Sequence, residues 1–269
     1  MIPDIGLGTF RFDDAEAAAA VRSALQMGYR HIDTAEMYGN EQGVGEGIRA
    51  AGVPRRELFV TTKVWHSHLR ADDTLAAIRA SLERLGLDYV DLALIHWPSP
   101  GGEVPVAETL DALAEARRQG LIARFGVSNF TEPLLEEALA TPEGGGIATN
   151  QVEVHPWLAN RELVDFCQER GVPVTAYMPL AKARVMDDPV LKAVAQKYNA
   201  HPAQVALAWL LARGLIVIPA SRNPEHQKLN FHARDLRLDQ DDRTRIDALD
   251  QGLRLINPDF APDWQATAA

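Results

Sequence analysis

An aspartate and a tyrosine stand five residues apart in a stretch that can do proton chemistry. Residues 31–33 read as the end of a buried strand, and the chain then turns toward a helix that begins at Glu41, with Asn40 as its N-cap. The carboxylate of Asp33 therefore ends a strand, and the phenol of Tyr38 lies in the loop that follows. We interpret Tyr38 as a proton donor and Asp33 as a group that helps to tune it. The alternative is that Asp33 caps the loop and Tyr38 only packs.

Two further polar residues end the next predicted strands. Lys63 ends the strand next to the one that Asp33 ends, so the two side chains can easily form an ion pair. An ammonium group nearby favours the phenolate of Tyr38 and is expected to lower its pKa from about 10. His96 ends the following strand and can hydrogen-bond the same substrate oxygen. The competing interpretations are a structural salt bridge and an ordinary core histidine.

Eight strand–helix units position these residues. Because the strands alternate with helices and are continuously apolar, they predict a parallel sheet covered on both faces. Eight units in 269 residues predict a closed (β/α)8 TIM barrel formed by a single domain over 1–269. The expected strands are 5–10, 31–33, 58–65, 90–97, 124–129, 148–154, 172–177 and 215–220. The expected helices are 13–27, 41–51, 72–85, 106–119, 132–140, 160–170, 189–198, 202–213, one from 224, and 239–249, with Asp13 and Asn160 as the N-caps of the first and the sixth.

Polar side chains gather at the carboxyl ends of these strands, where such barrels place their active sites. A buried strand that ends in a charged or amide group is costly unless something pairs with that group. Seven of the eight ends carry a charged, amide or hydroxyl side chain, so a shared site explains them better than separate loop chemistry. These residues are Asp33, Lys63, His96, Ser128 with Asn129, Gln151, Tyr177 and Ser221.

Composition narrows the function classes. The chain carries 27 basic and 37 acidic residues, a net charge of −10, which argues against nonspecific nucleic-acid binding. Its apolar runs are too short to span a bilayer, and no signal peptide is visible. The only cysteine, Cys167, lies in a helical pattern and is interpreted as a buried structural thiol. These features predict a cytoplasmic protein without a membrane partner.

Three other motifs are weaker candidates for a functional site. His66-Ser67-His68 lacks a third ligand, so no metal is expected. The run 43–47 imitates a dinucleotide fingerprint, but it has Ile48 where the last glycine belongs and starts inside a helix. Ser128 has no obvious base, and no nucleophile elbow is present.

The chain resembles the aldo-keto reductase family over essentially its whole length. The short loops resemble most the bacterial 2,5-diketo-D-gluconate reductase branch, especially its B-type members. The matching motifs, in family order, are Gly6-Leu7-Gly8-Thr9, His31-Ile32-Asp33-Thr34-Ala35, Tyr38-Gly39-Asn40-Glu41, Thr62-Lys63-Val64-Trp65, Leu94-Ile95-His96-Trp97-Pro98, Gly126-Val127-Ser128-Asn129-Phe130, Asn150-Gln151-Val152-Glu153-Val154-His155-Pro156, Ala176-Tyr177, Pro179-Leu180 and Ile218-Pro219 with Ser221.

This resemblance implies an NADPH-dependent reductase of small aldehydes and ketones, such as diketo-sugar acids or methylglyoxal. Tyr38 would be the general acid, Lys63 and Asp33 would lower its pKa, and His96 would orient the carbonyl. The matching positions assign the cofactor to Thr9, Asp33, Ser128, Asn129, Gln151, Tyr177, Pro179, Leu180, Ser221, Arg222, His226 and Asn230. They assign the substrate pocket to Phe10, Tyr38, Trp65, His96 and Trp97, for which ordinary core packing is the alternative.

Two departures bear on cofactor choice. Many relatives have a lysine where this chain has Ala220 and an arginine where it has His226, and those cations usually hold the 2′-phosphate of NADPH. Ser221, Arg222 and Lys228 remain nearby as replacements. We therefore expect NADP(H) to be favoured, with weakened discrimination against NAD(H).

Three points stay open at this stage. A noncatalytic cofactor-sensing subunit and a Schiff-base aldolase that uses Lys63 are alternative functions, although a carboxylate beside the lysine opposes the second. The resemblance predicts a monomer. Residues 253–264 are expected to border the pocket, with Arg254 as a candidate cation for an acidic substrate or else a surface residue.

Overall fold

The computed structural model describes residues 1–266, and their eight strands form one parallel sheet in the order β1 to β8. A parallel bridge between Ile5 and Val217 joins the first strand region to the last and closes the barrel. The predicted (β/α)8 fold is confirmed. The strands are β1 (Leu7–Gly8), β2 (His31–Asp33), β3 (Phe59–Val64), β4 (Val90–Ile95), β5 (Ile122–Ser128), β6 (Ile147–Glu153), β7 (Val174–Tyr177) and β8 (Ile216–Val217).

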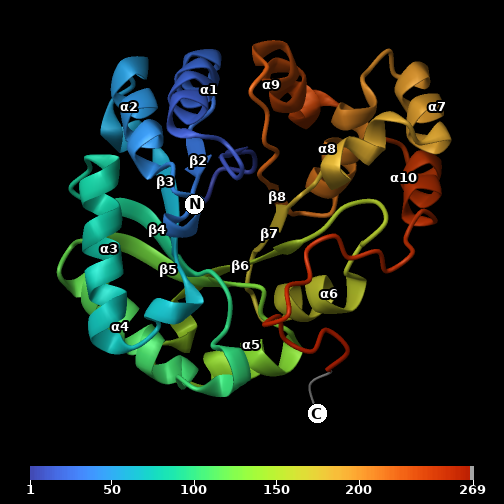
Figure 1. Ribbon diagram of the computed structural model, residues 1–269. Coiled ribbons are helices and arrows are strands. Elements are labelled where there is room, and N and C mark those ends of the chain that lie inside the picture. Colours follow the sequence, from blue (N-terminus) through green and yellow to red (C-terminus); the bar gives the residue numbers. More distant parts are fainter. Residues whose placement is uncertain (267–269) are drawn as a thin grey trace.

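The helices surround the strands (Figure 1). Most strand residues are buried, as expected for a parallel sheet that is covered on both faces. The helices are α1 (Asp14–Met27), α2 (Glu41–Ala51), α3 (Ala71–Leu85), α4 (Val106–Arg118), α5 (Glu132–Leu139), α6 (Arg161–Glu169), α7 (Pro189–Lys197), α8 (Pro202–Ala212), α9 (Pro224–Phe231) and α10 (Gln240–Asp247). The outermost helices pack on other helices, as α10 does on α7. Over residues 1–266, none is long and apolar enough to cross a membrane.

The first and last strands are shorter than predicted. β8 keeps only two of the six expected residues, and Pro219 lacks the N–H that would continue its ladder. Hydrogen bonding nevertheless extends beyond the strand, because the N–H of Gly8 donates to the carbonyl of Pro219 over 3.1 Å. Ser221 therefore lies four residues beyond β8 rather than at its end.

The helix starts were predicted correctly, but two of their caps were not. Asp13 forms the predicted cap of α1, with a capping box to Glu16. Asn40 directly precedes α2, yet its side chain makes no capping bond; its amide donates to the carbonyls of Thr9 and Phe12. Asn160 likewise leaves α6 uncapped and donates to the carbonyl of Glu153. Both amides tie loops of the barrel mouth together instead.

The glycines of the rejected fingerprint allow helices to pack closely. A Cβ on Gly43 would lie 2.1 Å from the carbonyl oxygen of Asp14 in α1, and one on Gly45 would lie 2.0 Å from that of Leu85 in α3. These distances are far below normal contacts. The glycine spacing of α2 is thus a packing feature that brings three helices together.

We predict that Gly45→Ala destabilises the protein by about 1–3 kcal/mol, because the added methyl group meets backbone rather than a movable side chain. Urea unfolding measures this. The matched control is Gly145→Ala, where a Cβ would meet nothing within 4 Å and the change should stay within about 0.5 kcal/mol. Equal effects of the two substitutions would contradict the packing role.

Candidate active site

A buried ion pair lies at the centre of the barrel mouth. The ammonium Nζ of Lys63, from β3, lies 2.5 Å from Oδ1 of Asp33, from β2, and both side chains are buried. The same nitrogen donates to the carbonyl of Thr34 over 2.8 Å and to the hydroxyl of Tyr38 over 3.2 Å. The three donors of one ammonium group are thereby all used. The predicted ion pair between adjacent strands is present.

A strand that is not adjacent to β2 in the sheet holds the other oxygen of the carboxylate. Nε2 of Gln151, from β6, donates to Oδ2 of Asp33 over 2.8 Å. Burial lowers the pKa of Lys63, but the charge of Asp33 and the contact with Tyr38 more than offset it, so the pKa lies above its ordinary value. Lys63 therefore stays charged at neutral pH.

The prediction that the pKa of Tyr38 is lowered is wrong for this structure. Burial raises the pKa of the phenol most strongly, Lys63 lowers it, and Asp33 raises it, with a net result above the ordinary value of 10.0. Lys63 acts in the predicted direction, whereas Asp33 opposes it because two negative charges repel. The phenol consequently keeps its proton over the whole neutral range.

His96 follows β4 and is neutral. Burial, then Lys63, then His66 hold the pKa of its imidazole well below the ordinary value of 6.5. Its ring lies 5.6 Å from that of Tyr38, centroid to centroid, at an angle of 74°. Nδ1 is buried with no hydrogen-bond partner among residues 1–266. The phenol and the imidazole thus form adjacent walls of one space.

A cleft of about 520 Å³ opens above these groups. It contains nearly all of the residues predicted for the cofactor and the substrate. Those that line it are Thr9, Phe10, Asp33, Tyr38, His96, Trp97, Ser128, Asn129, Gln151, Tyr177, Pro179, Leu180, Ser221, Arg222, His226 and Asn230. Lys63 lies beneath it. Trp65 does not line it but packs behind His96, with ring centroids 5.1 Å apart.

One wall of the cleft is a set of hydrogen-bonded polar groups at the ends of four strands, β4 to β7. The hydroxyl of Tyr177 donates to Oδ1 of Asn129 over 2.8 Å, and the amide of Asn129 donates to the carbonyl of His96 over 2.9 Å. Ser128 donates to the carbonyl of Gln151 over 2.8 Å. Asn129 adopts a left-handed conformation (φ 63°) that turns its side chain into this network. These contacts hold the four predicted residues rigidly in place.

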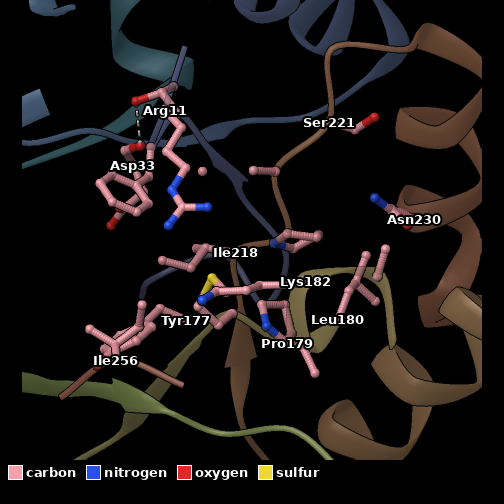
Figure 2. A pocket seen from close by; sticks show the side chains of 18 of the residues that line it. Arg11, Asp33, Tyr177, Pro179, Leu180, Lys182, Ile218, Ser221, Asn230 and Ile256 are labelled. Atoms are coloured by element: carbon pink, nitrogen blue, oxygen red, sulfur yellow. Dashed lines mark hydrogen bonds between the residues drawn. The ribbon is translucent and has the colours of Figure 1, made fainter. Parts of the chain in front are cut away.

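The other end of the cleft is reached through β8 and α9. Figure 2 shows Ser221 and Asn230 at this end, away from Asp33. Arg222, predicted as a replacement cation, lines the cleft but is ion-paired with Glu16 over 2.8 Å. His226 stacks on His201 with ring centroids 6.5 Å apart. The other predicted replacement, Lys228, does not line the cleft. Of the two predicted replacement cations, only Arg222 therefore reaches this end, and its charge is shared with an acidic residue.

Two cations of the cleft were missed. The side chains of Arg11 and Lys182 reach into the cavity (Figure 2). Both have left-handed backbone conformations, with φ of 68° and 54°, and Lys182 lies in a loop where Met178, Ala181 and Ala183 do as well. The only sequence signal was a basic residue in each of the loops that follow the first and seventh strands. Composition does not reveal that these loops fold over the cleft.

The C-terminal segment borders the cleft as predicted, but through Ile256. Arg254, the candidate cation, is not among the lining residues. Its guanidinium donates to Oδ1 of Asn160 over 3.3 Å and lies 3.6 Å from the ring centroid of Trp264. Of the two interpretations of Arg254, the pocket cation is wrong, because both partners hold the guanidinium outside the cleft.

Two remaining sequence motifs have structural explanations. Cys167 is buried, and burial raises the pKa of its thiol to about 11, which fits the predicted structural role. Within residues 1–266, no group of three or more histidine, cysteine or acidic residues is placed to hold a metal ion. In the 66–68 run, His66 packs on Trp65 and His68 pairs with Glu36 over 3.1 Å.

Comparison with known proteins decides the family. The model of the aldo/keto reductase family matches residues 4–251. The chain belongs to the aldo/keto reductase family. It is 48% identical over 264 residues to the methylglyoxal reductase DkgB of Salmonella typhimurium, covering 98% of this chain and 99% of that protein.

Solved aldo/keto reductases share the fold closely. A structure provisionally named as a 2,5-diketo-D-gluconic acid reductase B has a TM-score of 0.92 at 38% identity, covering 98% of this chain and 94% of that one. The Bombyx mori aldo-keto reductase in complex with NADP has a TM-score of 0.89 at 36% identity, covering 95% and 92%. These likenesses confirm the predicted family and the predicted branch.

For this aldo/keto reductase we predict that Lys63→Met costs about 3–5 kcal/mol of stability, because it leaves Asp33 buried without its counter-charge. Urea unfolding measures the loss. Adding Asp33→Asn removes the orphaned charge, so the double variant should be more stable than Lys63→Met alone. If the double variant instead loses the sum of the two single effects, the ion pair does not couple these residues.

Proposed function

We propose that this enzyme reduces small aldehydes and ketones with NADPH, and that Tyr38 donates the proton. The observation that carries the proposal is the contact of the Tyr38 hydroxyl with a buried, charged lysine at the floor of a cleft. Relatives named for methylglyoxal, glyoxal and diketo-gluconate reduction support a small carbonyl substrate. We further propose that it acts as a monomer in the cytoplasm.

The cleft residues fit a nicotinamide dinucleotide. Carboxamide and hydroxyl groups of Ser128, Asn129 and Gln151 can hydrogen-bond an amide at one end, beside the aromatic face of Tyr177. Arg11 and Lys182 place two positive charges midway, where a pyrophosphate needs them. Ser221 and Asn230 offer polar groups at the far end for a ribose and a base. When bound there, the cofactor supplies hydride to the carbonyl carbon.

The protein's own groups then act on the carbonyl oxygen. Tyr38 gives its phenolic proton to that oxygen as negative charge develops on it. Lys63 stabilises the phenolate left behind, because its ammonium group lies 3.2 Å from the phenolic oxygen. Asp33 keeps Lys63 charged. His96, neutral at this pH, can donate a hydrogen bond from its ring to the same oxygen.

The direct test follows NADPH consumption with a panel that includes methylglyoxal and a diketo-sugar acid. Tyr38→Phe should lower kcat by about 10²–10⁴-fold, because the variant lacks the acid, while NADPH binding followed by fluorescence is retained. Tyr198→Phe is the matched control, since that hydroxyl accepts a hydrogen bond from the N–H of Asp239 and does not line the cleft.

Two outcomes would favour other functions. Tight NADPH binding with no turnover of any carbonyl would favour a noncatalytic sensing subunit. Borohydride trapping of a substrate on Lys63 would favour the aldolase, which the paired carboxylate of Asp33 opposes. Full activity of the Tyr38→Phe variant would contradict the proposal that Tyr38 is the general acid.

Cofactor selectivity should respond to the two departures at the far end of the cleft. We predict that Ala220→Lys with His226→Arg raises the ratio of kcat/KM for NADPH over NADH by about tenfold or more, because one charge-assisted hydrogen bond to a phosphate contributes about 1.5–3 kcal/mol. Ala50→Lys, on the exposed side of α2, controls for net charge. An unchanged ratio would mean that other residues already determine selectivity.

A further inference from the structure

The C-terminal segment, residues 253–264, covers one side of the cleft. Ile256 lines the cavity, and Figure 2 shows it beside Tyr177. Phe260 packs on Trp65 and on Trp97 with ring centroids 5.6 and 5.5 Å apart. The segment contains no helix or strand, so its own backbone hydrogen bonds do not fix its position. Something outside the segment must hold it.

A buried carboxylate from the barrel does so. Glu153 is the last residue of β6 and is completely buried. Its Oε1 accepts the N–H of Leu255 over 2.8 Å, and its Oε2 accepts the N–H of Ile256 over 2.9 Å. The carboxylate therefore grips two consecutive amides, one of which belongs to a residue that lines the cleft.

This carboxylate has few other partners. Nε2 of His155 lies 2.9 Å from Oε1, and no lysine or arginine ion-pairs with Glu153 among residues 1–266. A carboxylate that is fully buried needs hydrogen bonds to replace its hydration. Two of its three partners are backbone amides of the segment. The buried carboxylate therefore needs the segment in place to keep its hydrogen bonds, and the segment needs the carboxylate to keep its position.

The anchor also belongs to the strand ladder that forms the cleft. Glu153 is paired with Tyr177 in the register between β6 and β7, and it lies two residues after Gln151 on the same strand. Alternate residues of a strand point to the same face. Glu153, which binds the segment, and Gln151, which contacts Asp33, are therefore held at a fixed spacing on the same face of β6.

We propose that Glu153 is a positioning residue that seats the segment 253–264 on the cleft and thereby sets which carbonyl compounds fit. The proposal rests on the carbonyl reduction proposed above. Substrates too small to reach Ile256 and Phe260 do not depend on the anchor, whereas those with a bulky or aromatic group do. Glu153 acts through the segment and does not touch the reacting atoms.

Hydrogen exchange of the full-length protein tests the anchor without requiring activity. Glu153→Gln offers one acceptor oxygen in place of two, so amide exchange in 253–264 should quicken by about tenfold or more, equivalent to about 1.4 kcal/mol of lost protection. The control is Asp91→Asn, which removes another strand carboxylate that accepts a backbone N–H, from Val60 over 2.9 Å, and that does not line the cleft. It should leave exchange in 253–264 unchanged. Equal exchange in both variants would overturn the anchor.

Kinetics test the consequence for substrates. Glu153→Gln should raise KM for an aromatic aldehyde by about tenfold or more and leave kcat/KM for methylglyoxal within about threefold. Phe260→Ala should give the same pattern, and the double variant should be little worse than either single one, because both act on the seating of one segment. A uniform loss for all substrates, or additive effects, would overturn the proposed role in selection. If the unaltered enzyme reduces no carbonyl, the proposed function fails while the exchange result still stands.

Discussion

The buried ion pair between Lys63 and Asp33 is the constraint on which the rest of the site depends. Neither charge is stable alone in the barrel, so each fixes the other, and their remaining hydrogen bonds fix Thr34, Tyr38 and Gln151. Such a pair adds little stability compared with apolar packing, but it is very sensitive to loss of one partner. Its value here is geometric: it holds a positive charge directly beneath the phenol.

That charge does not turn Tyr38 into a strong acid. Burial raises the pKa of the phenol more than Lys63 lowers it, and the carboxylate of Asp33 raises it further. Lys63 therefore offsets only part of the rise in the pKa of Tyr38 that burial causes. The result is a phenol that is protonated at neutral pH and contacts an ammonium group. In the proposed function, that ammonium group stabilises the phenolate after proton transfer. The neutral imidazole of His96 completes this arrangement.

Much of the fold and site could be predicted because the relevant signals are local. Strand–helix alternation predicts the barrel, and polar residues at strand ends, such as Asp33 and Gln151, predict its mouth. What could not be predicted depends on contacts between distant segments. The side chain of Asn40 bonds loop carbonyls instead of capping its helix. Arg11 and Lys182 reach the cleft only because their loops fold over it.

The same limit applies to charge and to the C-terminal segment. The sign of the pKa shift of Tyr38 depends on how deeply the ring is buried, which spacing along the chain does not encode. The sequence allows Arg254 to be either a pocket cation or a surface residue, and only its contacts with Asn160 and Trp264 place it outside the cleft. Glu153 is part of a family motif, but its bonds to residues 255 and 256 join positions about a hundred residues apart.

The central claim is that a protonated Tyr38 is held beside a permanent positive charge. Its most direct test is the titration of the Tyr38 phenol by NMR, with ¹³C-labelled tyrosine and Tyr38→Phe to assign the signal. The account predicts that the phenol titrates above its ordinary pKa of 10.0, and that Lys63→Met raises its pKa further, because the cation that favours the phenolate is gone. A phenol that titrates below that value, or whose pKa falls or stays constant in Lys63→Met, would contradict the account.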